Sequence, residues 1–534
     1  MGSLGLVELV LLFSVSYTIC HAIYNMYFHP LRSFPGPKLW FTTVLFRHVA
    51  AMRGRLDWDL KRFHEQYGDV VRFSPDELSF IGEQAWEDIY GNRDNNLEKD
   101  PAWYNVAKIA DQATTVWTAD RADHTRLRRL LSPAFSDKAL REQESLIRSY
   151  VDLLIARLRE LALAGKPVDM VQWYNFTTFD IIGDLALGKS FGCLRGGQYH
   201  SWVKRIFDSI KIGPFTRTMS AYTDVKKVMG LLAPKALREA RAQHEAYVAD
   251  AARERLEKGV MEERRDFLSY ILQMMRDDTA NGQGDGVTDK EIAASCSFFI
   301  IAGSETAATA LSGITYHLLK NPDALEKLVT EIRSAFSSED EINLASTGAT
   351  ALPYLQACIS EGLRLYPPAP SLLPRRTPRG ETVKIAGYQV PGWTAVGVHV
   401  LSATRSTQNF HAPESFIPER WLPSSPSSSS SPFHSDRRAA SRPFSTGPRG
   451  CMGKSLAYHE MRLILARILW GFDLELCGAE DGRDGKKAWD KQKVYMFWEK
   501  GALMCRLRVR NDGVVTGSSV GEKSVGGELE GEDE

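Results

Sequence analysis

One cysteine near the C-terminus lies in a glycine-rich segment suited to hold an anionic metal ligand. The segment runs from Phe444 to Gly453 and places Arg449 two residues before Cys451. Glycines let a backbone approach a flat ligand, and a helix expected from Lys454 favours negative charge at its N-terminus. A thiolate there, beside an arginine that can meet a carboxylate, is typical of an axial ligand of haem iron. The alternative for a single cysteine is a buried, inert side chain.

A second candidate lies in a long apolar segment that predicts a buried helix. Thr288 and Glu291 form a capping box, and the apolar pattern continues to about Leu319. This helix would be roughly 45 Å long. Near its centre stand Glu305 and Thr306, polar groups that are costly to bury without a purpose. The alternative to a catalytic pair is a local kink in which Thr306 donates back to the carbonyl four residues earlier.

An acidic and a basic residue share one face of another predicted helix. Glu361 and Arg364 are three residues apart, before a stop at Tyr366 and two prolines, and Arg420 follows downstream. Surface pairs of this kind contribute little to stability. A solvated helix face is therefore the alternative to a buried ion-pair network.

The remaining pattern predicts a mainly helical chain. Residues 137–164 and 234–258 have apolar residues at three- and four-residue steps, whereas 70–73, 77–81 and 383–385 predict short strands. No long linker interrupts the chain between residue 39 and about residue 510. Beyond lies an acidic tail of low apolar content, which is expected to be disordered. The serine-rich tract at 424–431 predicts a surface loop.

The ordered motifs resemble the cytochrome P450 family, and the resemblance extends to about residue 510. Its haem-binding signature is matched by Phe444, Gly447, Arg449, Cys451 and Gly453. The resemblance implies the cytochrome P450 fold, mainly α with a small β portion, and haem b whose iron is ligated by the Cys451 thiolate. The stretch 27–37 also looks like that of microsomal enzymes of filamentous fungi.

The resemblance assigns roles to the other motifs. It implies that Glu305 and Thr306 relay protons during oxygen activation, with room left by Gly303. Glu361, Arg364 and Arg420 would form a structural ion-pair network. Side chains implied to hold the haem carboxylates are His124, Arg128, Arg375 and Arg449. Side chains implied to line the substrate pocket are Phe298, Phe299, Ala302 and Leu372, with contributions from the loop 104–116 and the hairpin near Trp498.

Electron supply and partners follow from the same resemblance. The chain has no flavin or nicotinamide motif, so electrons from NADPH would arrive through a separate cytochrome P450 reductase. Lys454 and cations of the 126–129 segment not engaged with haem would form its docking patch. The apolar pocket lining implies a hydrophobic small-molecule substrate. Its identity, the carbon attacked and the pathway stay open.

Composition excludes some classes of protein. Lys plus Arg equals Asp plus Glu at 66 each, so no global charge indicates a nucleic-acid partner. The 7 cysteines are scattered and odd in number, which disfavours a disulfide framework. A reducing compartment is expected.

The N-terminal segment predicts a membrane anchor. It is largely apolar from Leu4 to Phe28, and the first cation is Arg32. Its length suits one bilayer-spanning helix, and positive charge after it places the remainder in the cytosol. We expect an anchor at 1–30, a catalytic domain at 31–510 and a tail at 511–534, in the endoplasmic reticulum membrane. A buried helix is the alternative, which Glu8 favours.

These features predict a haem-thiolate monooxygenase that hydroxylates, epoxidises or desaturates a hydrophobic compound in fungal secondary-metabolite biosynthesis. One alternative is an isomerase or dehydratase that uses no dioxygen, against which the presence of Glu305 and Thr306 counts. Others are a monooxygenase that clears foreign compounds and a haem-binding protein without turnover.

Overall fold

The computed structural model describes residues 2–91, 97–104, 113–204, 213–215, 217–218, 235–259, 265–280, 286–423, 431–477 and 488–510. Its α-helices are α1 (Gly2–Tyr27), α2 (Lys38–Thr42), α3 (Leu45–Met52), α4 (Leu56–Tyr67), α5 (Glu83–Trp86), α6 (Pro101–Tyr104), α7 (Arg121–Leu131), α8 (Asp137–Leu163), α9 (Met170–Leu187), α10 (Cys193–Gly196), α13 (Lys235–Glu257), α14 (Phe267–Ala280), α15 (Asp289–Lys320), α16 (Pro322–Ala335), α17 (Pro353–Leu365), α18 (Val400–Thr404) and α19 (Lys454–Gly471). Short 3₁₀ or π turns include η1 (Glu87–Gly91), η2 (Ser132–Phe135), η4 (Pro418–Trp421) and η6 (Gly447–Arg449).

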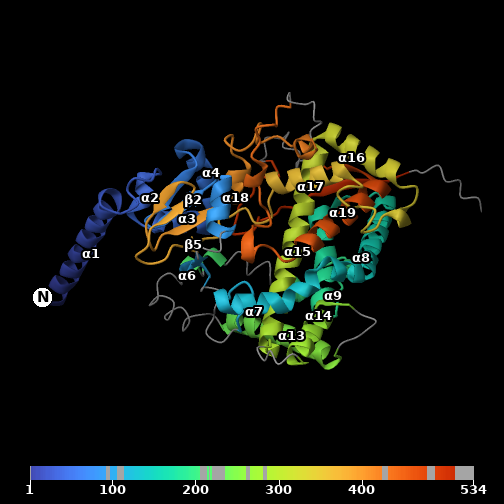
Figure 1. Cartoon of the computed structure of the whole chain (residues 1–534), viewed down its shortest axis with the longest axis horizontal. Coiled ribbons are helices and arrows are strands. Elements are labelled where there is room, and N and C mark those ends of the chain that lie inside the picture. Colours follow the sequence, from blue (N-terminus) through green and yellow to red (C-terminus); the bar gives the residue numbers. More distant parts are fainter. Residues whose placement is uncertain are drawn as a thin grey trace, which may run out of the picture.

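The strands form small sheets at the edges of the helical body. They are β1 (Val70–Ser74), β2 (Glu77–Phe80), β3 (Glu98–Lys99), β4 (Val168–Asp169), β5 (Arg375–Arg376), β6 (Val383–Ile385), β7 (Tyr388–Val390), β8 (Ala395–Val398), β9 (Phe472–Leu476) and β10 (Met504–Val509). The largest sheet has the order β1-β2-β8-β5-β3, and within it only β2 and β8 are parallel. It lies toward the end of the molecule that carries α1 (Figure 1).

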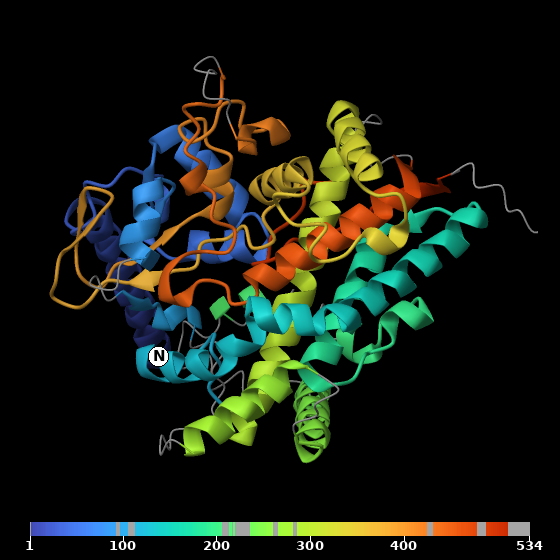
Figure 2. The same ribbon diagram turned by 45° about the vertical axis from the view of Figure 1, so that its right-hand side comes forward.

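The long predicted helix is confirmed as α15, which runs through the helical body (Figures 1 and 2). Thr288 caps it, and both hydrogen bonds of the capping box to Glu291 are present. Over its 32 residues it is about 48 Å long. α9, α13, α17 and α19 all pack against it, so its centre lies in the core. The mainly α fold and the strands expected at 70–73, 77–81 and 383–385 are confirmed.

In the part of the chain that the structure describes, two helices are long and apolar enough to cross a membrane. Val7–Tyr27 of α1 has no buried part in its most apolar window, and it projects from the body (Figure 1). The other is α15, whose window is 56% buried, as expected of a core helix. The predicted tail at 511–534 and residues 424–430 of the serine-rich tract lie outside the described residues.

The last turns of α1 belong to the folded body. Asn25 is buried, and its carbonyl accepts a hydrogen bond from Arg72 Nη1 at 3.0 Å. Its side-chain amide donates to the Thr42 carbonyl of α2 at 3.2 Å. Arg72 itself is fully buried in β1, and its guanidinium stacks on Phe41 at 4.4 Å. The end of α1 is therefore fixed against the first strand.

Candidate active site

The Cys451 loop is held by its own backbone. The Cys451 N–H donates to the Phe444 carbonyl at 2.9 Å, across the η6 turn. Gly447 has a φ of +71°, and a Cβ there would lie 2.0 Å from the Tyr90 carbonyl oxygen of η1. Glycine is thus required where the loop passes η1. α19 begins at Lys454, so Cys451 lies just before a helix N-terminus, as predicted.

The environment of the Cys451 thiol is mixed. The pKa of Cys451 is raised by burial, and the Gly453 N–H and the cations Arg128 and Lys454 offset only part of that rise. Yet the side chain is exposed. The thiol is thus surrounded by protein and still accessible to a ligand.

A group of cations lies beside this loop. Arg128 of α7 donates to the Gly450 carbonyl at 2.7 Å, and Arg449 donates to the Ala119 carbonyl at 2.9 Å. Arg449 Nη2 is 3.7 Å from Glu98 Oε2, too far for a hydrogen bond. Within the described chain, buried Nη1 of Arg375 and Nη2 of Arg449 have no hydrogen-bond partner. Unpartnered buried guanidinium nitrogens are costly unless a ligand accepts from them.

A lysine that the sequence did not single out joins this group. The β3–β5 pairing sets Lys99 opposite Arg375, and Lys99 Nζ donates to the Trp117 carbonyl. Burial, followed by the charges of Arg449 and Arg375, lowers the pKa of Lys99 to about 6. The pKa of His124 falls to about 3, again first through burial and then through Arg449.

The chemistry of this site fits haem. Cations that are desolvated and lower one another's pKa need an anionic ligand with more than one acidic group. The two propionates of haem meet that need, and a cysteine thiol near a helix N-terminus meets the need of its iron. His124, Arg128, Arg375, Arg449 and Cys451 are therefore brought together, with Lys99 as an addition.

The predicted alternative for Thr306 is seen in α15. Its hydroxyl donates to the Ala302 carbonyl at 2.6 Å, as in a locally satisfied helix. Gly303 does not leave room for a ligand, which corrects the expectation from resemblance. A Cβ at Gly303 would lie 2.8 Å from Ile182 Cδ1, so the glycine permits close packing of α9 against α15.

Glu305 makes an unexpected ion pair. Its Oε1 accepts from Lys500 Nζ at 2.6 Å, and the same ammonium donates to Thr309 Oγ1 at 2.6 Å. Both charged side chains are nearly fully buried. Glu305 Oε2 has no partner among the described residues. Sequence analysis missed Lys500, since nothing local marks a lysine 195 positions away as the partner of Glu305.

Replacing Lys500 by methionine should lower the free energy of unfolding by about 3–5 kcal/mol, because the Glu305 carboxylate is left buried without a cation. Adding Glu305→Gln should recover most of that loss by removing the stranded charge. Urea unfolding followed by tryptophan fluorescence measures both. Lys493→Met is the control: its side chain is 61% exposed, so it should cost less than about 1 kcal/mol. Equal stability of the single and double variants would contradict the ion pair.

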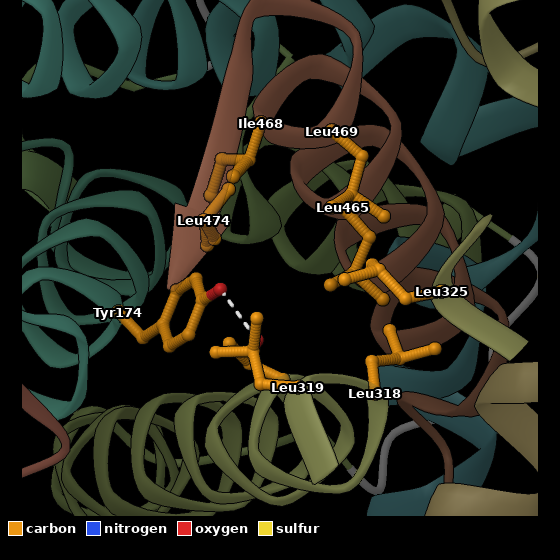
Figure 3. A pocket seen from close by; sticks show the side chains of 9 residues that line it. Tyr174, Leu318, Leu319, Leu325, Leu465, Ile468, Leu469 and Leu474 are labelled. Carbon is orange, nitrogen blue, oxygen red and sulfur yellow. Dashed lines mark hydrogen bonds between the residues drawn. The ribbon is translucent and has the colours of Figure 1, made fainter. Parts of the chain in front are cut away.

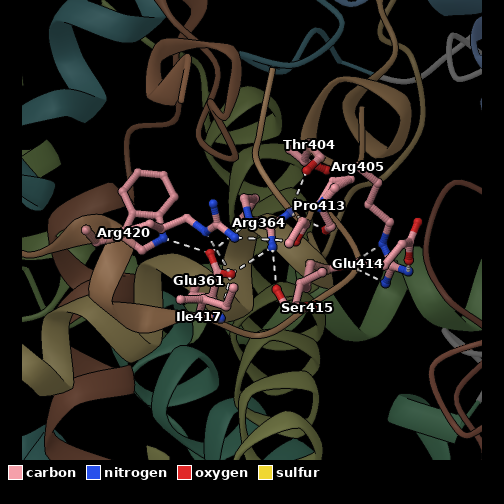
Figure 4. Close-up of polar contacts among 12 residues, drawn as sticks. Glu361, Arg364, Thr404, Arg405, Pro413, Glu414, Ser415, Ile417 and Arg420 are labelled. Carbon is pink, nitrogen blue, oxygen red and sulfur yellow. Dashed lines mark hydrogen bonds and ion pairs between the residues drawn. The ribbon is translucent and has the colours of Figure 1, made fainter. Parts of the chain in front are cut away.

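The pair Glu361 and Arg364 is buried, which excludes the solvated helix face. Arg364 donates to both carboxylate oxygens of Glu361, at 2.7 and 2.8 Å, and Arg420 donates to Oε1 at 3.1 Å (Figure 4). All three side chains are fully buried. Burial alone would raise the pKa of Glu361, but Arg364 and then Arg420 outweigh it and hold that pKa below its usual value.

The arginines of this network also bind backbone carbonyls. Arg364 donates to the carbonyls of Thr404, Pro413 and Ser415 at 2.6–3.0 Å (Figure 4). The network therefore ties α17 to the segment that follows α18. Its hydrogen bonds satisfy the charged groups that burial would otherwise penalise.

The predicted substrate residues on α15 point in different directions. Phe298 stacks on Trp117, with ring centroids 5.8 Å apart and planes at 21°. Phe299 is buried against Phe135 and Phe267, at 5.2 and 5.9 Å. Phe298 thus contacts Trp117, whose carbonyl accepts from Lys99, whereas Phe299 packs against the η2 turn and α14.

The other predicted substrate residues are spread further. Leu372 lines a pocket beneath α3 and β2, together with Trp103. Trp498 is buried and stacks on Tyr366 with ring centroids 4.5 Å apart. Ala302 is half-buried on α15. Residues 105–112 of the predicted loop lie outside the described part of the chain.

A small apolar pocket lies far along α19 from Cys451 (Figure 3). It is lined by leucine and isoleucine side chains of α15, α16, α19 and β9. Its only polar contributions are Tyr174 and Thr315, whose hydroxyls bond each other at 2.7 Å. No group there is free to bind or to react, so we interpret it as a packing space.

One cation of the expected docking patch, Arg126, is engaged in ion pairs. Arg126 donates to Glu291 Oε1 at 2.5 Å and to Asp123 Oδ1 at 3.1 Å. The hydrogen bond to Glu291 is the main cause that raises the pKa of Arg126 above its usual value. Arg126 therefore fastens α7 to the N-terminus of α15. Lys454 stays exposed at the start of α19.

Comparison with known proteins agrees with the site. The cytochrome P450 family profile matches residues 34–497. The chain is 44% identical to the trichothecene C-4 hydroxylase of Trichoderma arundinaceum over 94% of this chain and 97% of that protein. It is 42% identical to the cytochrome P450 monooxygenase olcB of Penicillium canescens, over 95% and 99%. It is 44% identical to the monooxygenase astA of Talaromyces wortmannii, over 93% and 96%. The chain belongs to the cytochrome P450 family of haem-thiolate monooxygenases.

Proposed function

We propose that this monooxygenase oxidises a hydrophobic small molecule in a fungal secondary-metabolite pathway, with electrons from NADPH delivered by a separate reductase. The observation that carries the proposal is the Cys451 loop, which Arg128 binds, together with buried nitrogens of Arg375 and Arg449 that have no hydrogen-bond partner among the described residues. Relatives named as a trichothecene hydroxylase and as monooxygenases of fungi support the pathway class.

In this proposal Cys451 ligates the haem iron, and Phe444, Gly447 and Gly453 shape its loop. His124, Arg128, Arg375 and Arg449 hold the propionates, with Lys99 beside them. Thiolate-ligated haem supplies the activation of dioxygen when bound. The protein supplies orientation and access.

The proton relay is assigned to α15. Thr306 holds its hydroxyl proton toward the Ala302 carbonyl, so its oxygen lone pairs are left to accept a hydrogen bond. Glu305 Oε2 has no hydrogen-bond partner among the described residues, so it can accept a hydrogen bond while Oε1 stays bonded to Lys500. The pair thus offers two acceptor atoms one residue apart in the core of the molecule.

Comparing metabolites of the native host with the intact chain and with Cys451→Ala tests the proposal. A precursor lacking one oxygen should accumulate if the chain is a hydroxylase or epoxidase. A precursor differing by two hydrogens would instead indicate a desaturase or coupling oxidase. An unchanged profile in a host shown to express the pathway would contradict a biosynthetic role.

α1 is proposed as a single-pass anchor in the endoplasmic reticulum membrane, with the catalytic domain in the cytosol. Deleting residues 2–20 should release the protein from membranes and leave its thermal unfolding midpoint unchanged. Deleting residues 2–30 should also lower that midpoint. The buried guanidinium of Arg72 would then lose the Asn25 carbonyl to which it donates. Membrane flotation and a thermal melt measure the two effects. Flotation of the shorter deletion with membranes would contradict the anchor.

A further inference from the structure

A second pocket lies between the sheet and α3, away from the packing space of Figure 3. Its cavity volume is about 60 Å³, and it is open to the solvent. Most of its lining is apolar, including Leu56, Leu60, Phe73, Leu372 and Met496. Four charged side chains also line it: Arg47, Asp57, Glu77 and Arg217. Charged groups in an apolar pocket must be paired or serve a ligand.

Three of the four charges are already paired. Arg47 Nε lies 3.2 Å from Glu77 Oε1, and Asp57 Oδ1 lies 3.1 Å from His399 Nε2. Arg217 has no ion pair or hydrogen bond within the described part of the chain, and its Nε is buried. Its guanidinium stacks on the Trp103 ring at 4.1 Å from the centroid. Burial, and next the charge of Arg47, lowers the pKa of Arg217 to about 10.

Stacking on an aromatic ring orients a guanidinium but does not use its hydrogen-bond donors. A buried guanidinium nitrogen without an acceptor, as at Arg217 Nε, is costly, and a carboxylate is the partner whose two oxygens match the guanidinium fork. We propose that this pocket binds the carboxylate of a hydrophobic acid substrate through Arg217. This inference rests on the proposed function in one respect: only that function makes the bound acid a substrate.

A line of aromatic rings connects Arg217 with α15. Trp103 lies 6.2 Å from Trp117, and Trp117 stacks on Phe298 at 5.8 Å. Phe298 is one turn before Ala302 and two turns before Thr306 on α15. An acid anchored at Arg217 would therefore extend its apolar part along this line toward the residues assigned to oxidation. The carbon oxidised would be remote from the carboxylate.

Binding of dodecanoate and of 1-dodecanol tests the proposal, because the two probes share a chain and differ in charge. Equilibrium dialysis is done on the full-length, haem-loaded protein in phosphatidylcholine nanodiscs, with empty nanodiscs subtracted. Dodecanoate should bind at least about tenfold more tightly than 1-dodecanol, as expected for hydrogen bonds to a charged group. Arg217→Gln should remove that preference and leave 1-dodecanol binding unchanged, whereas Arg217→Lys should retain part of it.

Arg62→Gln is the matched control, because Arg62 is 66% exposed on α4, and it should keep the full preference. Equal binding of both probes to the unaltered protein would overturn the proposal. A preference for dodecanoate that survives Arg217→Gln would also overturn it. An equal loss of binding of both probes in that variant would do the same, because it would mean that Arg217 only shapes the pocket. Dialysis measures binding and requires no turnover. An abnormal carbon monoxide spectrum of the unaltered protein would therefore contradict the proposed function but not the binding of a carboxylate at Arg217.

Discussion

Cys451→Ser should abolish the carbon monoxide difference band of thiolate-ligated haem and, with it, all measurable turnover. A hydroxyl is a far weaker anionic donor to iron than a thiolate, so the electron density that the sulfur supplies would be lost. The measurement is the reduced carbon monoxide spectrum of purified protein, together with its haem content by pyridine extraction.

Cys20→Ser is the control for this replacement, because Cys20 is an exposed cysteine on α1, outside the folded body. It should leave the spectrum unchanged. A normal band in Cys451→Ser would exclude Cys451 as the iron ligand, and the assignment of the whole loop would fail with it.

Glu361→Gln should destabilise the protein by about 3–5 kcal/mol, because Arg364 and Arg420 would remain buried without their common counter-charge. The arginines would also repel each other. Urea unfolding and haem retention measure the loss. Lys327→Gln is the control: it breaks an exposed pair with Glu419 and should cost less than about 1 kcal/mol.

The same network predicts acid sensitivity. The pKa of Glu361 is lower in the folded protein than its usual value of 4.5, so the stability it contributes is present above that value. That contribution is lost as the pH falls below 4.5 toward the lowered pKa of the folded state. The free energy of unfolding, measured as the pH is lowered, should therefore decrease less steeply in Glu361→Gln than in the unaltered protein. The same decrease in both proteins would contradict an ionised Glu361.

Features with a local cause were predicted correctly from the sequence. The Thr288 capping box needs only residues within one turn, and it starts α15 where expected. The hydroxyl of Thr306 likewise bonds within its own helix. The pairing of Glu361 with Arg364 follows from helical spacing, but its burial depends on η4 and the segment after α18, which local spacing does not reveal.

Features set by contacts between distant segments were missed or wrong. Lys99 joins the cation group only because β3 pairs with β5, and Lys500 reaches Glu305 only through the tertiary fold. The space beside Gly303 is filled by Ile182 of α9, so a glycine in a polar stretch did not indicate room for a ligand. The sequence alone does not show which helices pack against each other.

The attachment of α1 to Arg72 has a consequence for how the enzyme meets its supply of substrate. If α1 spans a membrane as proposed, the attachment of its last turns to β1 and α2 would hold the catalytic body at one tilt over the lipid. α3, a wall of the Arg217 pocket, lies at that same end (Figure 1). An acid dissolved in the bilayer keeps its carboxylate among the headgroups and its tail among the acyl chains. The lipid would thus act as both reservoir and aligning medium, and would present each molecule to the protein already oriented.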